Sequence, residues 1–268
     1  MQLAYREEGK EGKVIIIVHG LFGSSDNWMT TAKKLREHYH IYIVDQRNHG
    51  NSPHSDEHNY ESMKEDLAEF FEFHKIHRAT VIGHSMGGKT AMYFAADYPE
   101  KIEKLVVVDI APVDYLKRGT DSQFHQHAFI LKCLKELQNY SFSNRKDIAD
   151  FLNKRLHDLS LVNFLLKSIR HNKETNSFYC RLNVNVLDSS LDEIMEGVNK
   201  DWFDDRLPIT SYPVLFIEGE KSSYIGEDEQ TQIRAIYPEA EFKIIPNAGH
   251  WLHAEQPLLF QQAIEQFV

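Results

Sequence analysis

The stretch Ala79–Ala95, ATVIGHSMGGKTAMYFA, determines which fold the rest of the chain has to complete. It begins with a run typical of a buried strand, Thr80–Ile82, turns abruptly at Gly83–Gly87 and continues as a helix. A G-x-S-x-G sequence in this setting predicts a nucleophile elbow, a sharp turn that lifts its serine hydroxyl, here that of Ser85, above the sheet. Both glycines are required because a side chain at either position would strike neighbouring backbone. The first turn of the helix points N–H groups at the same place, which favours negative charge there.

Length and composition narrow the class of protein. The chain of 268 residues is 42% hydrophobic and 26% charged, as expected of a globular protein with a substantial core. Its formal net charge of −10 argues against a nucleic-acid partner, which would favour a basic surface. It has no apolar run near the ~18 residues that cross a bilayer, and its first residues do not resemble a signal peptide. We therefore expect no membrane span.

The numbers and spacing of cysteines and histidines indicate where the protein is located and whether it binds a metal ion. Cys133 and Cys180 form no C-x-x-C pair and are too few for a disulfide scaffold, so a reducing cytoplasm is the expected location. The fifteen histidines show no metal-ligand spacing such as H-E-x-x-H. We expect neither a metal nor a cofactor.

Apolar runs alternate with amphipathic segments over much of the chain, which predicts an α/β fold with a mostly parallel sheet and right-handed crossovers. Buried strands are predicted at Val14–Val18, Ile41–Val44, Thr80–Ile82, Leu105–Val108, Val214–Glu218 and Phe242–Ile245, with an edge strand at Gln2–Arg6. Helices are predicted at Ser25–Glu37, Tyr60–His74, after Ser85, at Gln230–Tyr237 and from about Gln256, where Pro257 suits a first helical turn.

The alternation stops in the middle of the chain. Helices are predicted there at Phe124–Leu137, Asn144–Leu156 and Leu159–Arg170. We therefore expect a core of residues 1–111 and 213–268 and a helical lid of residues 112–212. The lid should cover the carboxyl ends of the strands, where ligands bind in such sheets. Four lid aromatics either line the pocket or only pack the lid onto the core: Phe124, Phe129, Phe164 and Phe178.

A serine nucleophile needs a base that takes its proton, and chain order places that base last. His250, after the last strand and preceded by Gly249, is the expected base, with His253 as a nearby competitor. The acid is less obvious. In many hydrolases it follows the strand that corresponds to Val214–Glu218, but Ser222 stands there, and a neutral hydroxyl cannot stabilise an imidazolium as a carboxylate does.

Other carboxylates lie near enough to supply the acid. Glu220 is close in sequence and Glu218 belongs to the strand, so Asp109, at the end of the preceding strand, is the preferred candidate. Ser222 would then hydrogen-bond His250 or Asp109; the competing interpretation of Ser222 is a solvated loop serine. Asp109 as a simple turn cap is the competing interpretation.

An oxyanion hole requires two preorganised N–H donors. Met86, directly after Ser85, supplies one, and the glycine-rich loop after the first buried strand supplies the other. Leu21 is our first choice in that loop and Phe22 the second. His84, beside the nucleophile, is assigned a supporting or substrate-binding part.

Four blocks of the sequence together resemble a known family: His19–Ser24, Asp45–Ser52, Gly83–Lys89 and Val108–Pro112. They are similar to the YbfF-type esterases of the α/β-hydrolase superfamily, over most of the chain but weakly in the lid. The resemblance implies an α/β-hydrolase fold and hydrolysis of acyl esters, including thioesters such as acyl-CoA. It also implies that the acid follows the strand ending at Asp109, that a serine matches Ser222 and that Arg47 matches a family arginine, which we interpret as tying loops together.

We expect a serine hydrolase that cleaves small to medium acyl (thio)esters through an acyl-enzyme, with Ser85 as nucleophile, His250 as base and Asp109 as acid. Its partner would be a small-molecule ester or thioester substrate. The same fold also hosts lyases, cofactor-free perhydrolases and slow-turnover receptors for small molecules, which remain the alternatives.

Overall fold

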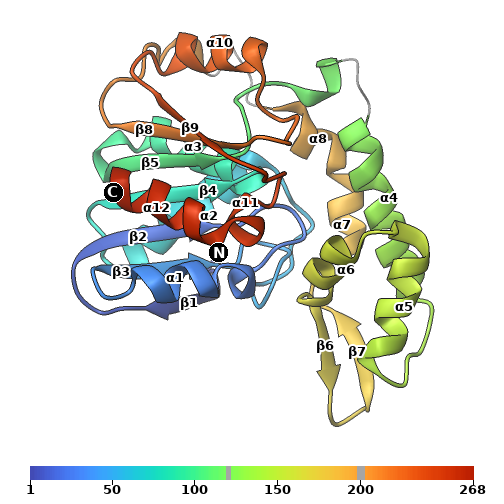
Figure 1. Cartoon of the computed structure of the whole chain (residues 1–268). Helices are drawn as coiled ribbons and strands as arrows, with labels where there is room; N and C mark the ends of the chain where they lie inside the picture. Colours follow the sequence, from blue (N-terminus) through green and yellow to red (C-terminus); the bar gives the residue numbers. More distant parts are fainter. Residues whose placement is uncertain (119–121, 198–202) are drawn as a thin grey trace.

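A seven-stranded sheet forms the centre of the computed structural model, which describes residues 1–118, 122–197 and 203–268 (Figure 1). The strand order is β1-β3-β2-β4-β5-β8-β9. Six strands run parallel, and β1 at the edge pairs antiparallel with β3. The strands are β1 (Tyr5–Glu8), β2 (Lys13–Val18), β3 (Tyr39–Val44), β4 (Ala79–His84), β5 (Ile102–Val108), β8 (Val214–Gly219) and β9 (Glu241–Ile245). The predicted α/β-hydrolase architecture is confirmed.

Helices cover both faces of this sheet because alternate strand residues point to opposite sides. Ile16 and Val18 of β2 pack in one cluster with α2, α3 and α10, while Ile15 and Ile17 pack in another with α1, α11 and α12. These helices are α1 (Met29–Leu35), α2 (Tyr60–Phe73), α3 (Met86–Asp97), α10 (Glu227–Ile236), α11 (Leu252–Glu255) and α12 (Pro257–Phe267). Runs of apolar residues therefore make strands that are buried on both faces.

Two predicted elements at the N-terminal end differ from the structure. The edge strand begins at Tyr5 rather than Gln2, because its register with β3 pairs Tyr5 with Val44 and Glu8 with Ile41. The segment predicted as one helix over Ser25–Glu37 is a 3-10 turn, Ser25–Asn27, followed by α1.

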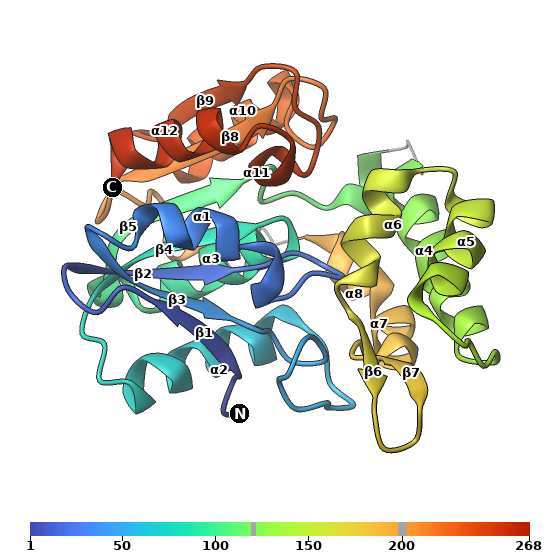
Figure 2. The same ribbon diagram turned by 60° about the horizontal axis from the view of Figure 1, so that its bottom comes forward.

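The mainly helical segment between β5 and β8, which we expected to be a lid and call the lid below, lies beside the strand ends in both views (Figures 1 and 2). Its described elements are α4 (Ser122–Leu137), α5 (Arg145–Leu156), α6 (Leu159–Leu166), β6 (Ile169–Asn172), β7 (Ser177–Cys180), α7 (Val184–Ser189) and α8 (Leu191–Glu196). The helix predicted over Leu159–Arg170 ends four residues early, and the hairpin β6–β7 was not predicted. Its turn is set by Asn172, whose side chain accepts the Glu174 and Thr175 N–H groups, and by Asn176, which has φ 48°.

The elbow between β4 and α3 is held by close backbone contact. Ser85 has φ 52° and ψ −120°, a conformation that is costly for a residue with a side chain. A Cβ atom at Gly83 would collide with the carbonyl of Gly87, and one at Gly87 would collide with the carbonyls of Val18 and His19. The two glycines therefore let β4, α3 and the end of β2 meet at one point.

The hairpin end of the lid is tied to the core by charge. Asp26, just before α1, forms ion pairs with Arg170 and Arg181. Burial alone would raise the pKa of Asp26, but the hydrogen bond from Arg181 and the charges of both guanidinium groups hold it below its ordinary value. The backbone adds a link, because Asn183 N–H donates to the Asn48 carbonyl at 3.0 Å. These contacts fix one end of the lid beside the loop that follows β3.

Two side chains of the core, from α2 and α3, contact the backbone of helix α8. The Tyr60 hydroxyl donates to the Ile194 carbonyl at 2.8 Å, and the Lys89 ammonium contacts the Ile194 and Met195 carbonyls at 3.4 and 3.3 Å. These carbonyls belong to the last turn of α8, where intrahelical partners are missing. Lys89 is 1% exposed, and burial lowers its pKa to about 7 while the Asp114 and Glu196 carboxylates oppose the decrease.

We predict that Gly83→Ala destabilises the protein by about 3 kcal/mol or more, because its Cβ would force apart the backbone of the elbow. The free energy of unfolding in urea measures this. The matched control is Gly226→Ala, whose Cβ would meet only the flexible end of the Glu229 side chain and whose φ of −124° suits alanine. Equal stability of the two variants would contradict the close approach at the elbow.

We predict that Lys89→Met changes how stability depends on pH. Between pH 7 and the ordinary lysine pKa near ~10.4, the unfolded chain holds a proton that native Lys89 has released, so the wild type gains stability as pH rises. Its free energy of unfolding should increase relative to Lys89→Met by about 1.4 kcal/mol or more between pH 7 and 9. Parallel stability curves for the two proteins would show that Lys89 keeps an ordinary pKa.

Candidate active site

Three expected site residues meet at the carboxyl ends of neighbouring strands. Ser85 follows β4, Asp109 follows β5 and His250 lies in the loop after β9. The Asp109 Oδ2 atom lies 2.7 Å from His250 Nδ1. The Ser85 N–H donates to the Val108 carbonyl at 3.0 Å, which places the elbow directly beside Asp109.

Asp109 is fully buried and is held by three donors. Its Oδ1 atom accepts the Gly219 N–H at 3.0 Å, and its Oδ2 atom accepts the Ser222 hydroxyl at 2.5 Å as well as His250 Nδ1. Burial raises the pKa of Asp109 to about 6, and the hydrogen bonds from Ser222 and Gly219 oppose this rise. Ser222 therefore contacts the carboxylate, one of the two contacts left open by the sequence.

His250 is held on several sides. Its ring stacks on Tyr224, with centroids 4.2 Å apart, and its backbone carbonyl accepts a hydrogen bond from His84 Nε2 at 2.9 Å. Burial lowers the pKa of His250 below its ordinary value, which favours the neutral ring that a base requires. His84 therefore positions the loop that carries His250.

The competing residues face other partners. His253 stacks on Trp28, with centroids 4.1 Å apart, within the cluster under α1 and α12. Glu218 accepts from the Gln230 amide, and Glu220 accepts the Asn247 N–H. Among the described hydrogen bonds, Asp109 is the carboxylate that reaches His250.

The loop after β2 approaches the elbow as expected. Leu21, Ser85 and Met86 line one small cavity. The turn, loop and cap hydrogen bonds of the described residues leave the N–H groups of Leu21 and Met86 without an acceptor. The Phe22 N–H, our second choice, instead donates to His49 Nε2 at 3.3 Å. The geometry thus favours Leu21 over Phe22 as the oxyanion donor.

The cavity beside Ser85 is about 20 Å³, which holds little more than one water molecule. The rest of its lining comes from α2, α3, the segment after β5, the lid and the loop after β8: Tyr60, Lys89, Ile110, Tyr115, His127, Ile194, Met195 and Tyr224. None of these side chains was assigned to the pocket from the sequence. None of the four lid phenylalanines considered for the pocket lines it. Phe164, for example, packs on Trp251.

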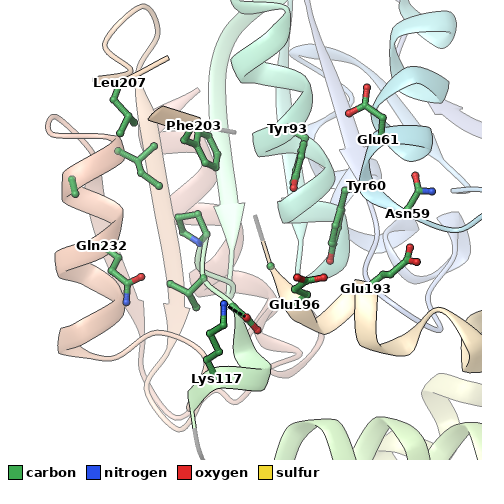
Figure 3. A pocket seen from close by; sticks show the side chains of 16 residues that line it. Asn59, Tyr60, Glu61, Tyr93, Lys117, Glu193, Glu196, Phe203, Leu207 and Gln232 are labelled. Atoms are coloured by element: carbon green, nitrogen blue, oxygen red, sulfur yellow. Dashed lines mark ion pairs between the residues drawn. The ribbon is translucent and has the colours of Figure 1, made fainter. Parts of the chain in front are cut away.

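A larger pocket of about 990 Å³ lies between α2, α8 and α10 (Figure 3). Its described lining shares Tyr60 with the cavity beside Ser85 and includes the carboxylates of Glu193 and Glu196 and an ion pair between Lys117 and Asp114. None of the expected catalytic residues lines it. The smaller cavity is therefore the candidate site.

In the part of the chain that the structure describes, no group of three or more histidine, cysteine or carboxylate side chains is arranged to hold a metal ion. None of the described helices combines the length and the apolar character needed to span a bilayer.

Known proteins resemble this chain over most of its length. The family model of the alpha/beta hydrolase fold matches residues 13–257. Esterase YbfF of Escherichia coli is 36% identical over 95% of this chain and 92% of its own. The sn-1-specific diacylglycerol lipase ABHD11 of Mus musculus is 36% identical over 95% of this chain and 80% of its own.

A solved structure agrees with these sequence matches. It is described as a marine microorganism esterase, has 39% sequence identity and superposes with a TM-score of 0.92 over 100% of this chain and 99% of its own. The chain therefore belongs to the α/β-hydrolase fold family and, within it, to the YbfF-type esterases.

Proposed function

We propose that this protein cleaves carboxylic esters and thioesters of small to medium acyl chains through a Ser85–His250–Asp109 triad and an acyl-enzyme. The observation that carries the proposal is the contact of His250 Nδ1 with the buried Asp109 carboxylate, beside a serine on a strained elbow. The names of the relatives, an esterase and a lipase, support the same class of reaction.

The chemistry follows from the tautomer of His250. Because Nδ1 donates to Asp109, Nε2 carries the lone pair that accepts the Ser85 proton. Ser85 attacks the acyl carbonyl, and the Leu21 and Met86 N–H groups stabilise the oxyanion that forms. His250 then protonates the leaving alcohol or thiol, and water repeats the sequence to release the acid. Asp109 keeps the charged imidazolium stable during both steps.

The described residues leave little room beside Ser85. Among the described hydrogen bonds there is none between the Ser85 hydroxyl and His250, a contact that often tightens only when substrate binds. An acyl group also needs more room than about 20 Å³. We propose that the cavity widens for substrate by a movement of α8, whose last turn contacts Tyr60 and Lys89 in its lining.

Ser85→Ala should lower the hydrolysis of a short-chain p-nitrophenyl ester by at least about 10³-fold without unfolding the protein, because no other group can form the acyl-enzyme. His250→Asn should have an effect of similar size. His253→Asn is the matched control, since that residue packs on Trp28 and should keep most of the turnover. A panel of p-nitrophenyl and acyl-CoA substrates would define the acyl length.

Substantial turnover by Ser85→Ala would remove the proposed nucleophile. A protein that reacts with a fluorophosphonate at Ser85 but barely turns over esters would instead indicate a receptor on the same fold.

The pH dependence of kcat/KM should reveal the Asp109–His250 pair. Asp109 must be ionised, so activity should be constant above neutrality and fall in acid with an apparent pKa near 6 that belongs to the pair. Ser222→Ala removes a hydrogen bond that stabilises the carboxylate, which raises the pKa of Asp109 further. The acidic limb should therefore move to higher pH by about one unit.

Asp109→Asn provides the comparison, because it removes the charge itself and should lower kcat far more than Ser222→Ala. An unchanged acidic limb in Ser222→Ala would show that this hydroxyl does not tune the pair. A greater loss from Ser222→Ala than from Asp109→Asn would contradict the assignment of the acid.

A further inference from the structure

The block Asp45–Ser52, DQRNHGNS, has no part in the chemistry described so far. Arg47 is structural, since its guanidinium forms a buried ion pair with Asp66 of α2 at 2.6 Å. Gln46 and His49, however, point to the loop that carries Leu21. Both are almost fully buried, at 2% and 0% exposure.

Gln46 bonds that loop twice. Its side-chain Nε2 donates to the His19 carbonyl at 2.6 Å, and its backbone N–H donates to His19 Nε2 at 3.0 Å. The His19 ring is in turn fixed, because its Nδ1 donates to the Gly20 carbonyl at 2.8 Å. The start of the loop, two residues before Leu21, is therefore anchored to a single glutamine.

The same glutamine also bonds the elbow helix. The Thr90 hydroxyl, in the second turn of α3, lies 3.0 Å from Gln46 Oε1 and 3.1 Å from the Met86 carbonyl. One amide thus connects the loop that carries Leu21 to the helix turn that carries Met86. These two segments supply the two proposed oxyanion donors, and their separation decides how well both reach one oxygen.

His49 fixes the far end of the loop. Its Nδ1 donates to the Arg47 carbonyl at 2.9 Å, so its Nε2 is the acceptor for the Phe22 N–H. Phe22 has φ 65°, a conformation that an unrestrained phenylalanine rarely adopts. Burial lowers the pKa of His49 to about 3, which keeps the ring neutral and the acceptor in place.

We propose that Gln46 is a positioning residue that sets the separation of the Leu21 and Met86 N–H donors by bridging the His19 carbonyl and the Thr90 hydroxyl, with His49 holding the Phe22 end of the loop. Gln46 touches neither substrate nor the reacting atoms. This inference rests on the proposed function, because it concerns the placement of the proposed oxyanion hole.

The test is a double-mutant cycle of Gln46→Met and Thr90→Val, with two readouts. One is kcat and KM for a p-nitrophenyl ester, and the other is the affinity for an aryl trifluoromethyl ketone, which forms an oxyanion adduct with a serine nucleophile. Gln46→Met should lower kcat by about 10-fold to 100-fold with KM changed less than about 2-fold. Affinity for the ketone should fall by the same factor as kcat/KM.

Thr90→Val is nearly isosteric and should give a smaller loss of the same kind. Because Thr90 acts through Gln46, the double variant should lose no more than Gln46→Met alone. Thr80→Val is the matched control: Thr80 is also buried, at 3% exposure, but lies at the far end of β4, and this variant should keep kcat and ketone affinity. If Gln46→Met does not fold, Thr90→Val still decides the question by its effect on the ketone.

Unchanged kcat and ketone affinity in both single variants, with only the melting temperature lowered, would reduce Gln46 to a structural residue. Additive losses in the double variant would show that Thr90 does not act through it. If the wild type itself shows no Ser85-dependent turnover, the proposed function fails. Ser85-dependent turnover that is insensitive to both substitutions overturns only the positioning role.

Discussion

The close backbone approach at Gly83 and Gly87 is the constraint on which the rest of the structure depends. It lets β4 turn into α3 within one residue, and it presses the start of that helix against the end of β2. Ser85 is left in a strained conformation at the point where the loop after β2 and the first turn of α3 converge. The remainder of the sheet, with helices packed on both faces, supplies the stability that keeps this strain in place.

The location of the proposed acid follows from strand order. Because β8 lies between β5 and β9, the ends of these three strands place Asp109, Ser222 and His250 side by side. The carboxylate after β5 reaches the histidine after β9 across the end of β8. In the proposed triad, a carboxylate after β8 is then not needed. Ser222 occupies that intermediate place and bonds the carboxylate, which favours its charged form.

The sequence predicted the sheet well, because strands buried on both faces appear as unbroken apolar runs such as Val14–Val18. It also predicted the residues that follow strand ends, since those lie at one edge of any parallel sheet. The hairpin β6–β7 was not predicted because each of its strands has only four residues of mixed polarity. No turn signal separates the first of these strands from α6. Other features depend on contacts between distant segments, which no local sequence pattern encodes. They include the cavity lining by Tyr60, Ile194 and Met195 and the bridge from Gln46 to Thr90.

The proposed reaction passes through a covalent acyl-enzyme on Ser85. The most direct measurement is peptide mass spectrometry of protein quenched with acid within milliseconds of mixing with a p-nitrophenyl ester. We predict an acyl group on the peptide that contains Ser85, formed no more slowly than turnover and lost as substrate is exhausted. Turnover without such an adduct, or an adduct that turns over on another residue, would contradict it.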